Sequence, residues 1–320
     1  MNQQNNSPFR TTIGGQALME GILMRGPHKQ AIVCRTKDGL VEKVEDIHPL
    51  KEKYPILGLP ILRGTVALFS SLANGMKALT YSAELLPEEM QGEPDKIDLW
   101  IEKHFSGETA QKLIIGVAMV LGVALAMLLF LILPTFIGGL VPAIRDNFYA
   151  RTLVEGVAKL VIFFVYMAMC AKMPEIARVF AYHGAEHKSI FCYEAGLELT
   201  VENVRPQSRL HPRCGTSFMF VVIIISILAG AFIHVESTLL RIGIKFLILP
   251  LIIGITFEIN HWVGAHDNFL TRFLSWPGKK IQLITTNEPD DEMIECAIRA
   301  LELVIPEEQG ADKWYTIHKK

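Results

Sequence analysis

The stretch LIIGVAMVLGVALAMLLFLIL (113–133) decides the fold class, because it contains no charged side chain over about twenty residues. A helix of this length reaches across the hydrocarbon core of a bilayer. Half of the 320 residues are hydrophobic, and the mean hydropathy is positive at +0.31. The composition therefore predicts a multipass membrane protein in contact with the lipid bilayer and does not favour an ordinary soluble enzyme.

Three further apolar segments follow, and we predict that each spans the membrane. The first begins near Leu153 and continues to Ala171, with Glu155 and Lys159 placed to pair one helical turn apart. The other two are Thr216–Ile233 and Leu239–Trp262. With four spans, the basic residues of 1–55, of 172–215 and of the C-terminal tail share one side, which the positive-inside rule makes cytoplasmic. Both termini are therefore predicted to be cytoplasmic.

The remaining segments predict small soluble elements. Residues 1–12 are expected to be disordered. Residues 13–55 are β-rich, since Ala31–Arg35 and Leu40–Val44 flank Lys37-Asp38-Gly39, a hairpin signal. Residues 56–111 are predicted to be interfacial and amphipathic helices, with 56–84 either at the interface or packed on the bundle. The tail 263–320 is predicted to hold a strand at Lys280–Thr285, then a helix from Asp290 to about Val304.

The fold class predicted is thus mainly α. A four-helix polytopic membrane domain (112–262), carrying a cytoplasmic His-rich loop (172–215), is joined to small cytoplasmic α+β elements from both terminal segments. The glycine-rich stretch 13–27 indicates either backbone that bends sharply or approaches another group closely, or a loop packed on a sheet.

Charge and cysteine content exclude some classes of protein. The net charge of −2 favours no specific nucleic-acid partner. The five cysteines form no C-x-x-C pair, which indicates reduced thiols rather than a secreted disulfide framework. The polar N-terminal stretch lacks the apolar core of a cleavable signal peptide, so we expect the internal segments to direct membrane entry.

Candidate chemistry is concentrated in His183-Gly184-Ala185-Glu186-His187, an H-x-x-E-H pattern. On a helix, positions 183, 186 and 187 fall within about a third of the circumference, so their side chains share one face. His211 and Cys214 precede the third predicted span, and Glu258, His261, His266 and Asp267 follow at the end of the fourth. The four-span topology places all three clusters on the cytoplasmic side.

Imidazole and thiolate are ligands that Zn²⁺ prefers, and three protein ligands leave one coordination position open. We therefore predict a zinc site held by His183, His187 and either His211 or Cys214, with Glu186 as the catalytic base. Iron or manganese is the alternative metal, although Glu258-x-x-His261 lacks the second copy that a di-iron site needs. Residues expected to support the site or replace a ligand are Glu258, His261, His266, Asp267, Glu20 and Arg213. The competing interpretation is a network of salt bridges and hydrogen bonds at the helix ends.

Four motifs carry a resemblance to a known family. IGGQALMEGILMRGP (13–27), AYHGAEHKSIFCYE (181–194), RPQSRLHPRCGTSF (205–218) and FEINHW (257–262) are similar to those of the YqhQ-like family of bacterial multipass membrane proteins. That family is a domain of unknown function labelled as predicted metal-dependent enzymes. The resemblance covers residues 10 to 305 and implies a protein of the bacterial cytoplasmic (inner) membrane.

Two functions are consistent with these observations. The first is a metal-dependent, hydrolytic membrane protein that acts at the cytoplasmic face. The alternative is a non-enzymatic scaffold or biogenesis factor that binds the translocon, the ribosome or other membrane proteins. The sequence indicates no substrate for the first and no particular partner for the second.

Overall fold

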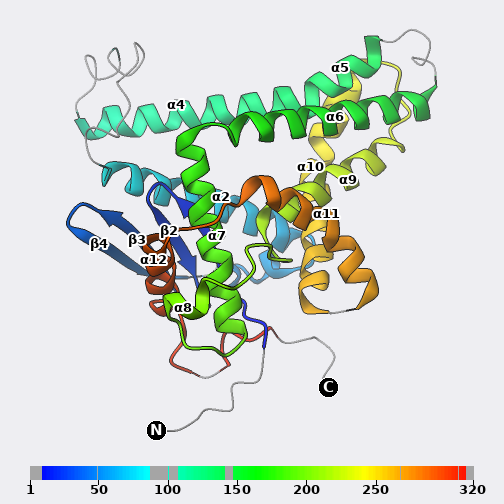
Figure 1. Cartoon of the computed structure of the whole chain (residues 1–320). Coiled ribbons are helices and arrows are strands. Elements are labelled where there is room, and N and C mark those ends of the chain that lie inside the picture. Colours follow the sequence, from blue (N-terminus) through cyan, green and yellow to red (C-terminus); the bar gives the residue numbers. More distant parts are fainter. Residues whose placement is uncertain are drawn as a thin grey trace. The chain divides into compact units, whose positions relative to one another are not determined.

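The computed structural model describes residues 9–48, 50–86, 100, 107–140, 147–266, 268–308 and 310–314 (Figure 1). The chain divides into two compact units. Unit 1 comprises residues 1–86, 167–222 and 253–320, and unit 2 comprises 87–166 and 223–252. Most of the expected disordered tail, most of the amphipathic helix expected over 86–111, and Asp267 lie outside the described residues.

Unit 1 contains a four-stranded antiparallel sheet of neighbouring strands in the order β1 (Gly14–Leu18), β2 (Gly21–Arg25), β3 (Lys29–Thr36) and β4 (Gly39–Asp46). The predicted hairpin is confirmed as β3 and β4. The glycine-rich stretch is part of the sheet itself, forming β1 and β2. The turn between those two strands places Glu20 at a φ of 48°, in the left-handed region.

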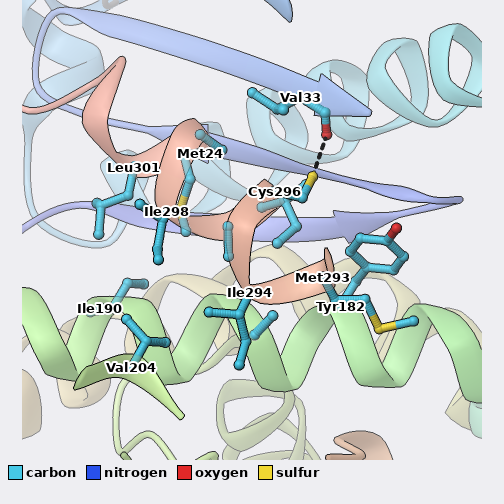
Figure 2. Packing of buried hydrophobic residues seen from close by; sticks show 14 of the residues in the cluster. Met24, Val33, Tyr182, Ile190, Val204, Met293, Ile294, Cys296, Ile298 and Leu301 are labelled. Atoms are coloured by element: carbon cyan, nitrogen blue, oxygen red, sulfur yellow. Dashed lines mark hydrogen bonds between the residues drawn. The ribbon is translucent and has the colours of Figure 1, made fainter. Parts of the chain in front are cut away.

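Helices cover both faces of this sheet. Because side chains alternate along a strand, Met24 and Val33 face one side, where α7 (Pro174–Glu194) and α12 (Asp291–Glu302) complete the main core. Figure 2 shows Ile294, Ile298 and Leu301 of α12 in this core. The Cys296 thiol donates to the carbonyl oxygen of Val33, and the two atoms are 3.2 Å apart. Leu23 and Ile32 face the opposite side and pack with Ala78 of α2 (Leu62–Glu84).

Local sequence explains where α12 and α7 begin. Asp290 caps α12 by accepting a hydrogen bond from the amide of Met293, and Asp291 and Glu292 occupy the first turn as the helix dipole prefers. This helix confirms the prediction for Asp290–Val304. Pro174 opens α7 at a position where its missing N–H costs nothing. The predicted loop 172–215 is therefore helical over much of its length, and it also contains the short helix α8 (Val201–Val204).

The predicted strand at Lys280–Thr285 is wrong, because this segment completes helix α11 (Phe269–Thr285). The helix starts upstream at a capping box in which Asn268 and Thr271 bond each other's backbone amides. Ile281, Gln282 and Thr285 are buried at helical spacing. Six residues of alternating apolar side chains are too few to distinguish the two-residue period of a strand from the 3.6-residue period of a helix.

Three helices are long and apolar enough to cross a membrane among the described residues. The first, Leu113–Leu140, joins α4 (Gly107–Met127), the π-turn η3 (Leu128–Ile132) and α5 (Leu133–Leu140). The others are α6 (Phe148–Cys170) and α10 (Thr238–Ala265). The third predicted span forms α9 (Gly215–Gly230), a shorter apolar helix, so a four-span topology stays a prediction. Residues 56–84 are helical as predicted, with α1 (Leu50–Lys53) and the 3₁₀ turn η1 (Pro55–Gly58) before α2, which is not among the candidate spans.

Unit 2 buries an ion cluster within its apolar helices. Glu155, 3% exposed, accepts hydrogen bonds from Arg151, Arg241 and Lys245. Lys159 is not among these donors to Glu155, although the sequence predicted that the two would pair. Its ammonium group donates instead to the Ser226 hydroxyl at 2.7 Å. The other N–H groups of the Arg151 and Arg241 guanidiniums donate to backbone carbonyls and threonine hydroxyls of the same unit. A buried charge in an apolar environment needs such partners, so the cluster fixes how these helices pack.

Candidate metal centre

The H-x-x-E-H motif lies in the middle of α7, and its histidines face the loop that precedes α9. The rings of His183 and His187 are 4.3 Å apart between centroids. The Nε2 atom of His183 is 3.1 Å from Sγ of Cys214. One ligand atom each from His183, His187 and Cys214 lies within 4.8 Å of the others. Of the alternatives predicted for the third ligand, the geometry therefore favours Cys214.

Hydrogen bonds to backbone carbonyls fix the orientation of both rings. Nδ1 of His183 is 2.9 Å from the carbonyl oxygen of Thr285, and Nδ1 of His187 is 2.5 Å from that of Arg209. A carbonyl can only accept, so Nδ1 carries the proton in each ring and Nε2 keeps its lone pair. This is how metal-binding histidines are held in proteins. Nε2 of His187 is buried and has no hydrogen-bond partner among the described residues.

The pKa shifts of His187 and Cys214 also suit a metal site. Burial lowers the pKa of His187, which favours the neutral imidazole, while the nearby Cys214 sulfur acts to raise it. Burial alone would raise the pKa of Cys214, but His187 and hydrogen bonds from Thr216 outweigh it and hold the pKa below its ordinary value. The buried thiols of Cys34 and Cys296 differ, since burial raises the pKa of each to about 12. Among these thiols, Cys214 is the one suited to act as a thiolate ligand.

Glu186 precedes His187 on α7, interacts electrostatically with His183 and Cys214, and is almost fully buried. Its Oε1 accepts a hydrogen bond of 2.9 Å from the amide of Gly15 in β1, whereas Oε2 has no partner among the described residues. Burial raises the pKa of Glu186 to about 7, while His183 acts to lower it and Cys214 to raise it. A carboxyl group with this pKa can both accept and return a proton at neutral pH.

Gly15 is required for this contact. A Cβ atom at position 15 would lie 2.6 Å from the carbonyl oxygen of Leu23 and 3.1 Å from Cδ of Glu186. The glycine-rich stretch therefore does contain backbone that approaches another group closely, as one of its two interpretations proposed. The particular partner, a glutamate on a helix about 170 residues away, was not predictable from the stretch itself.

His211 and Arg213 belong to a neighbouring network. The backbone of His211 is fixed by Gln282, which bonds both its amide and its carbonyl oxygen at 2.7 Å. Arg213 donates to Glu194, which also accepts from the amide of Thr11. Nε2 of His211 is 3.9 Å from this glutamate and 3.1 Å from the Arg213 guanidinium. His211 thus supports the loop that carries Cys214 and is not one of the three grouped ligands.

Of the other predicted residues, those that the structure describes lie outside the group of three. Glu258 accepts from the guanidinium of Arg63 at 2.5 and 2.8 Å and from the amide of Ile61. His261 lies against the ring of Trp314. Nδ1 of His266 is 2.9 Å from the carbonyl oxygen of Trp262. Glu20 bonds Arg178 and the hydroxyl of Tyr182.

Sequence reasoning did not identify the backbone groups that complete the centre. The carbonyls of Arg209 and Thr285 orient the imidazoles, and no side-chain pattern encodes them. Gln282 was equally hidden, because it lies in the segment predicted as a strand. Its burial on a helical face could have been recognised only from a helix period across Phe269–Thr285.

These features define a class of protein: mainly α-helical, with long apolar helices, a small antiparallel sheet and a His–His–Cys group of which two members are buried and one is half-buried. Residues 59–307 match the family described as "Protein of unknown function (DUF1385)". It is also 36% identical over 296 residues, 90% of either chain, to "Uncharacterized protein YqhQ" of Bacillus subtilis (strain 168). The chain belongs to this family, as the resemblance of its motifs predicted. No solved structure matches it.

Replacing Gly15 by alanine should disturb the candidate centre. The added methyl group must displace either the neighbouring strand or Glu186, at a cost of about 1–3 kcal/mol for overpacking. Gly14→Ala is the matched control, because a Cβ at position 14 meets nothing within 4 Å. Thermal unfolding of the detergent-solubilised protein measures both variants. Equal unfolding temperatures for the two variants would contradict the contact between β1 and Glu186.

Stability of the metal-free protein should depend on the ionisation of Glu186. Its folded pKa is about 7 and its unfolded value about 4.5, so the native state holds the proton more tightly. The stabilisation is complete below pH 4.5, decreases through the window up to pH 7, and amounts to roughly 3 kcal/mol. Glu186→Gln keeps an acceptor for Gly15 and removes the titration. Unfolding of chelator-treated wild type and Glu186→Gln at pH 5 and pH 8 tests this, and a pH-independent difference between them would refute it.

Proposed function

We propose that this protein is a membrane-associated metalloprotein that binds zinc through His183, His187 and Cys214 and uses Glu186 for hydrolytic chemistry. It would act at the cytoplasmic face of a bacterial inner membrane, where the positive-inside rule puts the basic segments. The observation that carries the proposal is the orientation of the two imidazoles. Both donate from Nδ1 to a carbonyl, and both direct Nε2 toward the thiol-containing group.

The spacing of the ligand atoms is compatible with a zinc site after a small adjustment. Ordinary zinc–nitrogen and zinc–sulfur bond lengths in a tetrahedron require ligand atoms roughly 3.3–3.6 Å apart. The three atoms lie within 4.8 Å of one another, and one pair is already at 3.1 Å. A side-chain rotation that shifts one ligand atom by roughly an ångström or less would bring all three separations into this range. The thiol also favours zinc over manganese, which prefers oxygen ligands.

The chain's own residues would divide the work in a simple way. The imidazoles and the thiolate hold the metal and leave one coordination position open, and a metal in such a site supplies a Lewis acid and an acidified water. Glu186, anchored through one oxygen by Gly15, has its second oxygen available to accept a proton. Gln282 and the Arg213–Glu194 pair fix the loop that carries Cys214.

Metal content of the purified full-length protein tests the ligand set. Wild type is expected to retain stoichiometric zinc by elemental mass spectrometry, whereas His187→Ala and Cys214→Ser should lose it. His211→Ala should keep the metal, because His211 is outside the group of three, and His28→Ala is an exposed control. In the cobalt-substituted protein, a thiolate-to-metal absorption band should disappear in Cys214→Ser. Wild type that takes up no zinc, or a His187→Ala/Cys214→Ser double variant that retains it, would rule out the centre.

Turnover tests the role of Glu186 separately. Glu186→Gln should keep stoichiometric zinc and lose hydrolysis, because the amide occupies the same space but cannot accept the proton. A membrane extract incubated with zinc-loaded wild type or with Glu186→Gln, then compared by mass spectrometry, should show hydrolysis products only with wild type. If both proteins leave the same products, the hydrolytic role is wrong, and a metal-stabilised scaffold for other membrane proteins becomes the better description.

A further inference from the structure

Helix α11 is amphipathic in the opposite sense to a water-facing helix. Its large apolar side chains point outward, with Phe269 86%, Phe273 64% and Trp276 60% exposed. Its buried face is made mainly of small or polar side chains: Thr271, Ser275, Gly278, Ile281, Gln282 and Thr285. A helix surrounded by water buries its apolar stripe and exposes its polar one. The outward face of α11 is therefore suited to an apolar environment.

The orientation of α11 is fixed by specific contacts within unit 1. Gln282 bonds the backbone of His211 and the hydroxyl of Ser217. Gly278 lies so close to Ser217 that an added Cβ would come within 2.5 Å of its hydroxyl oxygen. The carbonyl oxygen of Thr285 accepts from His183. Rotation that hides the aromatic residues would break these bonds, so the apolar face is a stable property of this unit.

The exposed residues form one continuous stripe. Phe269, Phe273, Trp276, Lys280 and Leu283 recur at intervals of three and four residues, which places them along one side of the helix. The Nζ atom of Lys280 is 5.8 Å from the centroid of the Trp276 ring. Aromatic rings with a lysine that can extend its ammonium toward water are the usual composition of the bilayer interface.

The charges on α11 and its position in the chain indicate which apolar environment it meets. The segment Phe269–Thr285 contains Arg272, Lys279 and Lys280 and no acidic residue, which matches the negative surface of a bilayer that contains anionic lipids. Only three residues separate its start from the end, at Ala265, of α10, which is a candidate membrane span. Seventeen residues with three cations and a polar face are not suited to spanning, and α11 is not among the candidate spans.

We propose that α11 is an interfacial anchor that lies in the plane of the membrane, with its aromatic face in the boundary between headgroups and acyl chains of an anionic bilayer. The same helix contributes Thr285 to the candidate metal centre. At about 1.5 Å per residue, Thr285 lies roughly 14 Å along the helix axis from Trp276. If the proposed zinc site exists, on which this last step rests, the anchor sets it close to the lipid headgroups.

Depth-dependent fluorescence quenching of Trp276 tests the anchor. The full-length protein, with Trp100, Trp262 and Trp314 replaced by phenylalanine, is reconstituted into vesicles of phosphatidylcholine and phosphatidylglycerol. We expect a blue-shifted emission, stronger quenching by lipids brominated near the headgroup than by lipids brominated deep in the chain, and little quenching by aqueous iodide. The same pattern is expected when tryptophan is moved one turn away, in a Phe273→Trp/Trp276→Phe variant, which controls for a local defect at either position.

Three results would overturn the proposal. Quenching by iodide without quenching by lipid would place the stripe in water. Resistance to both would show that a second copy or a partner protein covers it. Stronger quenching by the deep bromines would indicate a spanning segment. The measurement uses no metal, and repeating it on chelator-treated protein should give the same depth, so failure of the anchor and failure of the zinc site are distinguishable.

Discussion

The burial of α7 is the constraint on which unit 1 depends. One side of this helix supplies Ala181, Tyr182 and Ala185 to the main core, yet the helix also buries two carboxyl groups, an imidazole and an ammonium group, those of Glu186, Glu194, His187 and Lys188. A buried polar group without a partner costs about 1–3 kcal/mol, and an unpaired charge costs more. Each of these residues must therefore recruit a partner from elsewhere in the chain.

The partners come from segments that are distant in sequence. The amide of Gly15 comes from β1, the carbonyls of Arg205 and Arg209 come from the loop before α9, and the amide of Thr11 comes from the N-terminal segment. The need to satisfy one helix thus organises the contacts of unit 1. The candidate centre stands out against this background, since Oε2 of Glu186 and Nε2 of His187 have no partner among the described residues. In unit 2, by contrast, Glu155 is bonded by three cationic side chains. That difference is why we treat the group in unit 1, and not the ion cluster of unit 2, as the candidate ligand site.

Features encoded by local pattern could be predicted from the sequence. Hydropathy located the apolar helices, turn chemistry located the β3–β4 hairpin, and the spacing of H-x-x-E-H placed two imidazoles on one helical face. Tertiary contacts decided the rest. The choice of Cys214 over His211 depends on Gln282 and Arg213, which hold His211 in another network. Glu258 has suitable ligand spacing, but Arg63, almost two hundred residues earlier in the chain, takes its carboxylate. Such pairings are invisible to a one-dimensional pattern.

The state of Glu186 supports the proposal of a functional centre on physical grounds. A pKa near 7 means that burial opposes the ionised form, so a chain selected only for stability would gain by an apolar residue at this position. The fold instead keeps the carboxyl, bonds one oxygen to Gly15, and uses in β1 a glycine whose missing side chain makes room for it. Groups held in an unfavourable state by surrounding structure are concentrated at sites of binding and catalysis. A cation held by the neighbouring imidazoles and thiol would favour the ionised form of Glu186. The proposed metal therefore accounts both for the buried carboxyl group and for the orientation of its neighbours.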